Sequence, residues 1–241
     1  MEIRVFNLGI TDFENVWKLQ RDLVVQAENA IIPFNLVVCQ HYPVFTCGRK
    51  TDVNTILATE KKAREEGIRV YVIERGGDIT YHGPGQVTVY PVFDLRFLKK
   101  DLHWFLRSLE EVALELLVEF GARGERKTGM TGAWFGACKF ASIGIAVKNW
   151  ITFHGMSINV KRDDLRNFQL IKPCGMDIEM TCLENILGLN LKIDEIKRIV
   201  VRKIGELISQ GITRPGLLWQ YEQRAPYYVS LSGSIRMTVG Q

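Results

Sequence analysis

The chain has 241 residues, a formal net charge of +4 and a hydrophobic fraction of 46%. These values are typical of a globular protein with ample material for a core, and the charge is too small to indicate nucleic-acid binding. No stretch approaches the ~20 apolar residues of a membrane span, and the segment Met1–Ile10 lacks the features of a signal peptide, so we expect a cytoplasmic protein. Its five cysteines include no Cys-x-x-Cys pair, which argues against a disulfide framework and a zinc knuckle.

The first part of the chain reads as an alternation of strands and helices. Thr11 and Glu14 have the spacing of a capping box, which predicts a helix directly after a first strand, and Gly67 should end a second helix. The predicted strands are Glu2–Ile10, Leu36–Cys39, His41–Arg49, Ile68–Ile73 and Val87–Phe93, and the second helix is Leu57–Glu66.

The second part continues in the same way. Asp101 is a good N-cap for a helix that Gly121 should stop, and Thr181 and Glu184 form a second possible capping box. The predicted elements are a helix over Asp101–Phe120, strands over Lys139–Val147 and Ile151–Val160 that form a hairpin, and a helix over Asp194–Gln210 ended by Gly211. The segments Arg123–Thr128 and Asp163–Gly175 are expected to be irregular.

The segment Arg75–Gln86 (Arg-Gly-Gly-Asp-Ile-Thr-Tyr-His-Gly-Pro-Gly-Gln) joins two of these strands and holds four glycines. Glycine lets a ligand approach the main chain within hydrogen-bonding distance, which a side chain would prevent. A decorated hairpin loop is the plainer alternative, but a hairpin needs fewer glycines and no cluster of polar side chains. We therefore expect this segment to form the floor of a binding pocket.

Two further residues could carry chemistry. Cys174 lies between Pro173 and Gly175 in an irregular segment, so it could present its sulfur to a pocket, although most single cysteines are inert core residues. A thiolate requires a nearby positive charge at neutral pH, and Lys139 could provide it. Cysteine and lysine together suit acyl transfer. Cys138 should point away from Lys139, because side chains alternate along a strand.

The histidine and glycine patterns argue against a metal site and a nucleotide-binding site. His82 and His154 are each followed by glycine, and without a His-x-x-His spacing they are better explained as hydrogen-bonded wall residues than as metal ligands. No nucleotide phosphate loop is present. The basic residues Arg123, Arg126 and Lys127 form either a solvated turn or a contact for an acidic partner.

Four motifs together resemble one family. They are Arg75–Gln86, Lys139-Phe-Ala-Ser-Ile-Gly144, His154-Gly-Met-Ser-Ile-Asn159 and Pro173-Cys-Gly175, and they occur in the order and spacing of lipoyl(octanoyl) transferases. The resemblance implies an α+β fold with a mixed β-sheet and flanking helices, as in the catalytic domain of biotin and lipoate protein ligases. It covers a catalytic domain at residues 1–211 and leaves residues 212–241 as a tail of unknown role.

The resemblance also implies a reaction and a site. The family transfers an octanoyl or lipoyl group from acyl carrier protein to a specific lysine of lipoyl domains through a cysteine acyl-thioester, which implies that Cys174 is the nucleophile and Lys139 lowers its pKa. The residues implied to contact substrate are Arg75, Gly76, Gly77, Asp78, Ile79, Thr80, Tyr81, His82, Ser142, Ile143, Gly144, Gly155, Met156 and Ser157.

The implied partners follow from the family. The donor is octanoyl-acyl carrier protein, and the acceptors are the lipoyl domains of 2-oxoacid dehydrogenase complexes and the glycine cleavage H protein. We expect a monomer with no metal, no cofactor, no nucleic acid and no membrane. Two alternatives stay open: an ATP-dependent lipoate or biotin protein ligase on the same fold, and a non-catalytic module that binds acyl chains or lipoyl domains.

Overall fold

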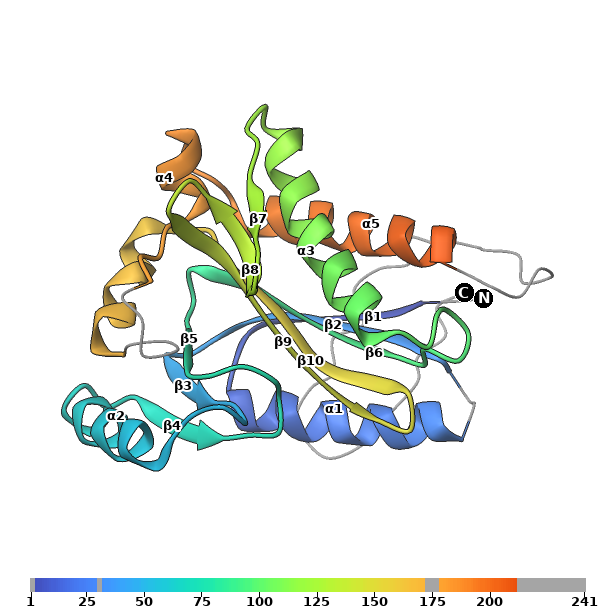
Figure 1. Cartoon of the computed structure of the whole chain (residues 1–241), viewed down its shortest axis with the longest axis horizontal. Coiled ribbons are helices and arrows are strands. Elements are labelled where there is room, and N and C mark those ends of the chain that lie inside the picture. The colour runs from blue at the N-terminus through green and yellow to red at the C-terminus, as the bar shows by residue number, and fades with distance from the viewer. Residues whose placement is uncertain (1–2, 30–31, 172–177, 212–241) are drawn as a thin grey trace, which may run out of the picture.

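The computed structural model describes residues 3–29, 32–171 and 178–211 (Figure 1). In chain order its elements are β1 (Arg4–Thr11), α1 (Phe13–Glu28), β2 (Phe34–His41), β3 (Val44–Cys47), α2 (Val53–Glu65), β4 (Arg69–Val72), β5 (Thr80–His82), β6 (Gln86–Phe93), α3 (Leu102–Glu119), β7 (Glu125–Lys127), β8 (Met130–Phe135), β9 (Cys138–Lys148), β10 (Ile151–Asn159), the 3-10 helix η1 (Arg162–Leu170), α4 (Leu183–Leu187) and α5 (Ile193–Gly211).

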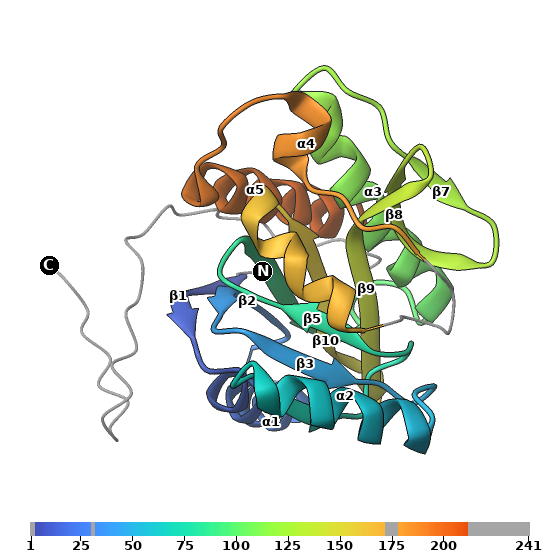
Figure 2. The same cartoon turned by 90° about the vertical axis from the view of Figure 1, so that its left-hand side faces the viewer.

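The strands form two sheets. A seven-stranded sheet has the order β1-β2-β6-β10-β9-β8-β7, with β1 parallel to β2 and every other pair of neighbours antiparallel. A three-stranded sheet has the order β4-β3-β5. Helices α3 and α5 cover one face of the large sheet, and α1 covers the other (Figures 1 and 2). The expected α+β architecture, a mixed sheet with flanking helices, is confirmed.

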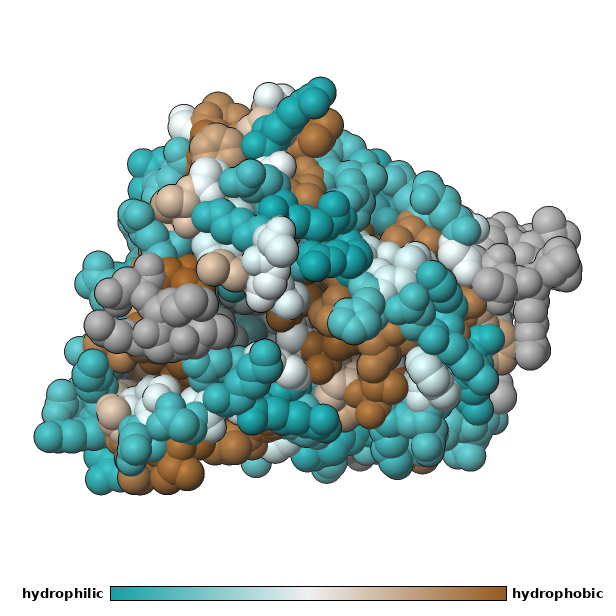
Figure 3. All heavy atoms as spheres, in the orientation of Figure 1, coloured by the Kyte–Doolittle hydropathy of each residue, from teal (hydrophilic) through white to brown (hydrophobic). Residues whose placement is uncertain are grey.

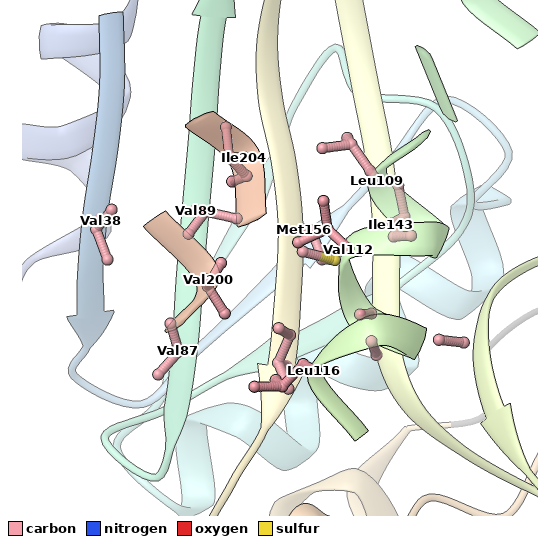
Figure 4. Close-up of a cluster of buried hydrophobic side chains, with 14 of the residues drawn as sticks. Val38, Val87, Val89, Leu109, Val112, Leu116, Ile143, Met156, Val200 and Ile204 are labelled. Carbon is pink, nitrogen blue, oxygen red and sulfur yellow. The ribbon is translucent and has the colours of Figure 1, made fainter. Parts of the chain in front are cut away.

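The alternation of side chains explains how the large sheet fills two cores. Along β2, Leu36 and Val38 belong to the core under α3 and α5, whereas Val37 and Cys39 belong to the core under α1. The first core brings strand residues such as Val89 against the two helices, as Figure 4 shows. Because both faces are covered, all eight residues of β6 are buried. This is why β6 reads in the sequence as a mostly apolar run and does not alternate regularly between apolar and polar residues.

The small sheet has a core of its own. Phe45 on β3 and Tyr81 on β5 pack with Phe168 of η1 and with Ala63 of α2. Tyr81 therefore belongs to a motif expected to contact substrate and is also a core residue. Its ring lies 5.4 Å from that of Phe168, edge to face.

The predicted elements exist, but both capping boxes are wrong. The N-cap of α1 is Asp12, which makes no side-chain cap hydrogen bond, because Thr11 is the last residue of β1 and pairs with His41. The N-cap of α4 is Cys182, also without a side-chain cap. The α3 cap is confirmed, since the Asp101 side chain accepts a hydrogen bond from the Trp104 N–H at 3.0 Å.

The structure excludes the hairpin-loop alternative for Arg75–Gln86, because β4 lies in the small sheet and β6 in the large one. Three predictions of local structure are wrong. The expected loop Arg123–Thr128 contains strand β7, and the expected irregular segment after Asp163 contains η1. Gly211 lies within α5 and does not follow it.

The surface matches the composition. The face shown in Figure 3 is largely hydrophilic, with smaller hydrophobic areas between the charged residues. None of the helices in the described ranges is both long enough and apolar enough to cross a membrane.

Candidate active site

The glycine-rich segment Arg75–Gln86 connects the two sheets. It leaves β4, forms β5 against β3 with Phe45 opposite Tyr81, and then enters β6 of the large sheet. The Gly76 N–H donates a hydrogen bond of 2.9 Å to the Ile145 carbonyl on β9, so the start of the segment is also attached to the large sheet. The segment is therefore fixed on both sides of the space between the sheets.

The side chain of Arg75 attaches this turn to strand β3. It is 7% exposed, and its Nε and Nη2 donate to the hydroxyl of Thr46 at 3.2 and 3.0 Å, while Nη1 donates to the Gly76 carbonyl at 3.1 Å. Glycine is required beside it at position 144, where a Cβ would lie 2.6 Å from the Gly76 carbonyl oxygen and 3.2 Å from Arg75 Cδ. The missing side chain of Gly144 thus leaves room for the motif itself and not for an open groove.

A cavity of about 160 Å³ borders this turn. The catalytic candidate Lys139 lines it, together with most of the residues expected to contact substrate: Arg75, Gly77, Asp78, Ile79, Thr80, His82, Ser142, Ile143, Gly144, Gly155, Met156 and Ser157. Gly76 and Tyr81 are not among its lining residues. The Tyr81 hydroxyl points to the other side of the motif, where it donates to Asp164 Oδ1 at 3.0 Å.

Several wall residues were not found from the sequence. Helix α1 contributes Phe13, which the helical spacing had indicated only as a packing residue, and β6 contributes Thr88 and Tyr90. No sequence signal separates such residues from the rest of a core. The other additions are Lys50, Ile73, Gly129, Met130, Thr131, Phe168, Ile178 and Met180. His154, which the sequence had indicated as a wall residue, also lines the cavity.

Two buried histidines line the cavity. Burial lowers the pKa of His82 well below its usual value, and it lowers the pKa of His154 as well. The His82 ring stacks on Phe13, with ring centroids 6.2 Å apart. Both imidazoles are therefore neutral near pH 7 and can offer hydrogen bonds without a charge. Among the described residues, no group of three or more His, Cys, Asp or Glu side chains could hold a metal ion.

The backbone at His154 has an unusual conformation. Its φ angle is +57°, in the left-handed region, although it lies within β10. Its N–H donates to the buried Gln20 Oε1 of α1 at 2.7 Å, and its Nε2 lies 3.5 Å from Glu74 Oε2. The contact with His154 lowers the pKa of Glu74 to about 2. The Gln20 contact fixes the main chain at His154, and the ring lies beside Glu74 in the cavity wall.

Lys139 lies at a β-bulge between β8 and β9. Ala133 pairs with Ala141 but the next residue, Trp134, pairs with Lys139, so one residue of β9 is left over. The Lys139 Nζ donates to the Thr131 carbonyl at 3.0 Å and lies 4.8 Å from the centre of the Trp134 ring. Lys139 lines the cavity and Cys138 does not, in line with the expected alternation.

Cys174 lies outside the described residues, together with Pro173 and Gly175. Of the residues that follow this segment, Ile178 and Met180 line the cavity, and Met180 forms a parallel bridge with Lys139. The described chain thus leaves this segment and passes directly beside Lys139.

A mixed sheet with helices on both faces, a smaller second sheet and a glycine-rich turn between them define the architecture of lipoate and biotin protein ligases. A bi-partite lipoate protein ligase from Thermoplasma acidophilum has a TM-score of 0.64 at 15% identity, with 87% of this chain and 84% of that chain covered. A biotin protein ligase from Aquifex aeolicus has a TM-score of 0.51 at 13% identity, with 87% and 71% covered. At these identities the likeness concerns the fold alone.

Comparison with related sequences shows to which family within this fold class the chain belongs. The family described as lipoyl protein ligase A/B catalytic domain matches residues 12–205. An octanoyltransferase from Caldicellulosiruptor saccharolyticus is 39% identical over 212 residues, which cover 87% of this chain and 90% of the relative. The chain belongs to the lipoyl protein ligase A/B catalytic domain family, within its octanoyltransferases, and it is an acyltransferase.

Proposed function

We propose that the protein transfers an octanoyl or lipoyl group from acyl carrier protein to a specific lysine of a lipoyl domain, in the cytoplasm, through an acyl-thioester on Cys174. Octanoyl transfer in protein lipoylation is the activity that the octanoyltransferase relatives support. The observation that carries the finer proposal is the position of Lys139. Its amine is held at the edge of a partly apolar cavity, beside the chain that leaves the Cys174 segment.

The reaction proceeds in two acyl transfers. The Cys174 thiolate attacks the carbonyl carbon of the carrier thioester, a new C–S bond forms, the bond to the carrier sulfur breaks, and the carrier leaves as a thiolate that solvent protonates. The amine of the recipient lysine then attacks the enzyme thioester, an amide forms, and the Cys174 sulfur leaves. One thioester replaces another in the first step and the amide is downhill, so the sequence of steps requires no ATP.

Lys139 has two tasks in this scheme. As an ammonium it favours the thiolate of Cys174 before acylation, and as a neutral amine it accepts the proton of the attacking lysine. The two protonation equilibria are coupled and change when the sulfur is acylated. The fixed side chain supports both tasks, because the Thr131 carbonyl and the Trp134 ring hold its nitrogen in one place.

The acyl chain is assigned to the apolar part of the wall. Ile73, Ile143 and Met156 line the cavity, and each methylene buried against such side chains contributes about 0.8 kcal/mol. The glycines of the motif are required for the path of the main chain. Gly144 accommodates the Gly76 carbonyl, and Gly77 has a φ angle of +85°, which a valine would adopt only with strain.

Partners are proposed from the family and from one neighbour. The Thermoplasma acidophilum ligase is described together with its E2 lipoyl domain. We assign lipoyl domains of 2-oxoacid dehydrogenase complexes and the glycine cleavage H protein as acceptors, and octanoyl-acyl carrier protein as donor. The protein acts as a monomer in this proposal.

A single-turnover experiment tests the scheme. Purified enzyme and octanoyl-acyl carrier protein are mixed without ATP, the acyl-enzyme is detected by intact mass, and a lipoyl domain is then added. Cys174→Ala should form no acyl-enzyme, whereas the matched Cys138→Ala should form it as the parent does. Lys139→Arg keeps the charge but cannot give up its proton. It should therefore form some acyl-enzyme and pass little of the acyl group on to the lipoyl domain.

Three outcomes would contradict the proposal. Full transfer by Cys174→Ala would remove the covalent mechanism. Transfer at the parent rate by Lys139→Arg would leave Lys139 as a counter-charge only. A strict requirement for ATP would favour the ligase reaction of the same fold.

A further inference from the structure

Two lysines, one from each neighbouring strand, lie against the indole ring of Trp134. Lys139 of β9 places its Nζ 4.8 Å from the ring centre, and Lys127 of β7 places its Nζ 4.4 Å from the same centre. Strand β8, which carries Trp134, lies between β7 and β9 in the sheet. The ring is 2% exposed, so both cations contact a fixed aromatic surface.

Both ammonium groups are held in place by main-chain oxygens. Lys139 Nζ donates to the Thr131 carbonyl at 3.0 Å, and Lys127 Nζ donates to the Ala137 carbonyl at 3.3 Å. Gly132 allows the close passage of the Lys139 side chain, because a Cβ there would lie 3.1 Å from Lys139 Cε. The distance between the two charges is therefore set by the fold and not by chance encounters of long side chains.

The two ammonium groups repel each other, because both lie close to the same ring. Since the nitrogens lie 4.8 and 4.4 Å from one centre, they are less than about 10 Å apart. At such a separation, with an effective dielectric constant between ~25 and ~80, a unit charge shifts the titration of its neighbour by about 0.3 to 1 pH unit. A nearby cation is a recognised way to make a lysine amine available as a nucleophile or base.

Other charged groups face Lys139 from the surrounding elements. The carboxylate of Glu110 on α3 accepts from the Gly132 N–H and is neutralised by Arg107 and Arg126. Glu179 contacts Lys139 through its main-chain carbonyl, which accepts from the Lys139 N–H at 2.9 Å, and its side chain is exposed. Asp78, Lys50 and Arg75 also line the cavity. Substitution of Lys127 leaves all of these groups unchanged.

We propose that Lys127 is a positioning residue for acyl transfer: its positive charge, held beside Lys139 by the ring of Trp134, favours the neutral amine of Lys139 that accepts a proton from the recipient lysine. This inference rests on the proposed role of Lys139 as a base. It assigns a chemical task to Lys127, which its sequence context presented only as part of a basic segment.

The test is the pH dependence of single-turnover transfer. Lys127→Gln should move the midpoint of the acidic limb to higher pH by about 0.3 to 1 unit, and should slow transfer below that midpoint by about two- to tenfold. Lys127→Arg keeps the charge and should restore the parent profile. The control is Lys100→Gln, because Lys100 lies 5.9 Å from the ring of Trp150, away from the cavity, and its removal should change nothing.

A second measurement does not depend on transfer. Competitive acetylation of amines at a series of pH values, followed by mass spectrometry, gives the protonation midpoint of Lys139, and this midpoint should shift in Lys127→Gln by the same amount. In the parent, raising the ionic strength from about 10 mM to about 0.5 M should move the midpoint upward, because salt screens the interaction between the lysines.

The outcomes separate the two proposals. If Lys139→Arg abolishes transfer but Lys127→Gln leaves both midpoints unchanged, the role of Lys127 is refuted and that of Lys139 stands. A loss of activity in Lys127→Gln that is equal at every pH would show a purely structural role and would also refute the inference. If transfer does not depend on Lys139, the role of Lys139 as a base is refuted, and that of Lys127 with it.

Discussion

Replacement of Thr46 by valine should destabilise the turn that carries the glycine-rich motif. The hydroxyl of this buried residue accepts from Arg75 Nε at 3.2 Å and from Nη2 at 3.0 Å, and valine offers no acceptor. Hydrogen bonds to charged groups contribute about 1.5–3 kcal/mol each, but two donors share this oxygen and Nη2 also donates to the Thr46 carbonyl. We therefore expect a loss of about 2–3 kcal/mol in the free energy of unfolding.

Urea unfolding followed by tryptophan fluorescence measures this change, with an unchanged slope required for the comparison. Thr46→Ser is the matched control: it keeps the hydroxyl and loses one buried methyl group, which costs about 1 kcal/mol. Turnover should fall further in Thr46→Val than in Thr46→Ser, because Arg75 holds the turn below the cavity. If Thr46→Val is as stable as Thr46→Ser or more stable, Thr46 does not hold Arg75 in the way described.

Three further predictions concern two glycines of the site, the buried His41 and the surface charge. Gly144→Ala should cost about 1–3 kcal/mol through overpacking, whereas Gly76→Ala, whose Cβ would meet nothing nearer than 3.5 Å, should cost less; equal losses in thermal unfolding would contradict the difference. Burial lowers the pKa of His41 to about 4, so its contribution to stability is complete above pH ~6.5 and is lost as the pH falls toward 4, by up to about 1.4 kcal/mol per pH unit; His41→Gln should flatten the pH dependence of urea unfolding in that range, and an unaltered slope would refute this. The KM for the carrier-bound substrate should rise with salt if an acidic partner docks at basic residues such as the exposed Arg123, and a constant KM over a tenfold increase in ionic strength would exclude this docking mode.

Local signals in the sequence were sufficient for much of the fold. Asp101 and the apolar stripe that follows it predicted α3, and the two β-prone runs on either side of Asn149 predicted the hairpin of β9 and β10. Both depend on neighbours in the chain. The capping boxes failed because Thr11 and Glu184 have stronger tertiary partners: Thr11 pairs in a strand, and Glu184 accepts from Lys161 at 2.8 Å.

The assignment of strands to sheets was beyond the reach of the sequence. β4 and β6 are both apolar and only a short segment separates them, so nothing local indicates that they belong to different sheets. The same limit applies to the cavity. Its motif residues were predicted by resemblance, but Phe13 of α1 and Met180 reach the wall only through tertiary packing. The roles of Cys174 and of residues 212–241 stay predictions, since both lie outside the described ranges.

The attachment of Arg75 and Gly76 to different sheets has a consequence for how the protein opens. The Arg75 side chain is bound to β3 of the small sheet, while the neighbouring Gly76 N–H is bound to β9 of the large sheet. Separation of the sheets therefore has to break at least one of the two sets, either the bonds of Arg75 to Thr46 or the bond of Gly76 to Ile145. If the turn stays with the small sheet, the amide proton of Gly76 should exchange with solvent only when the two sheets separate locally.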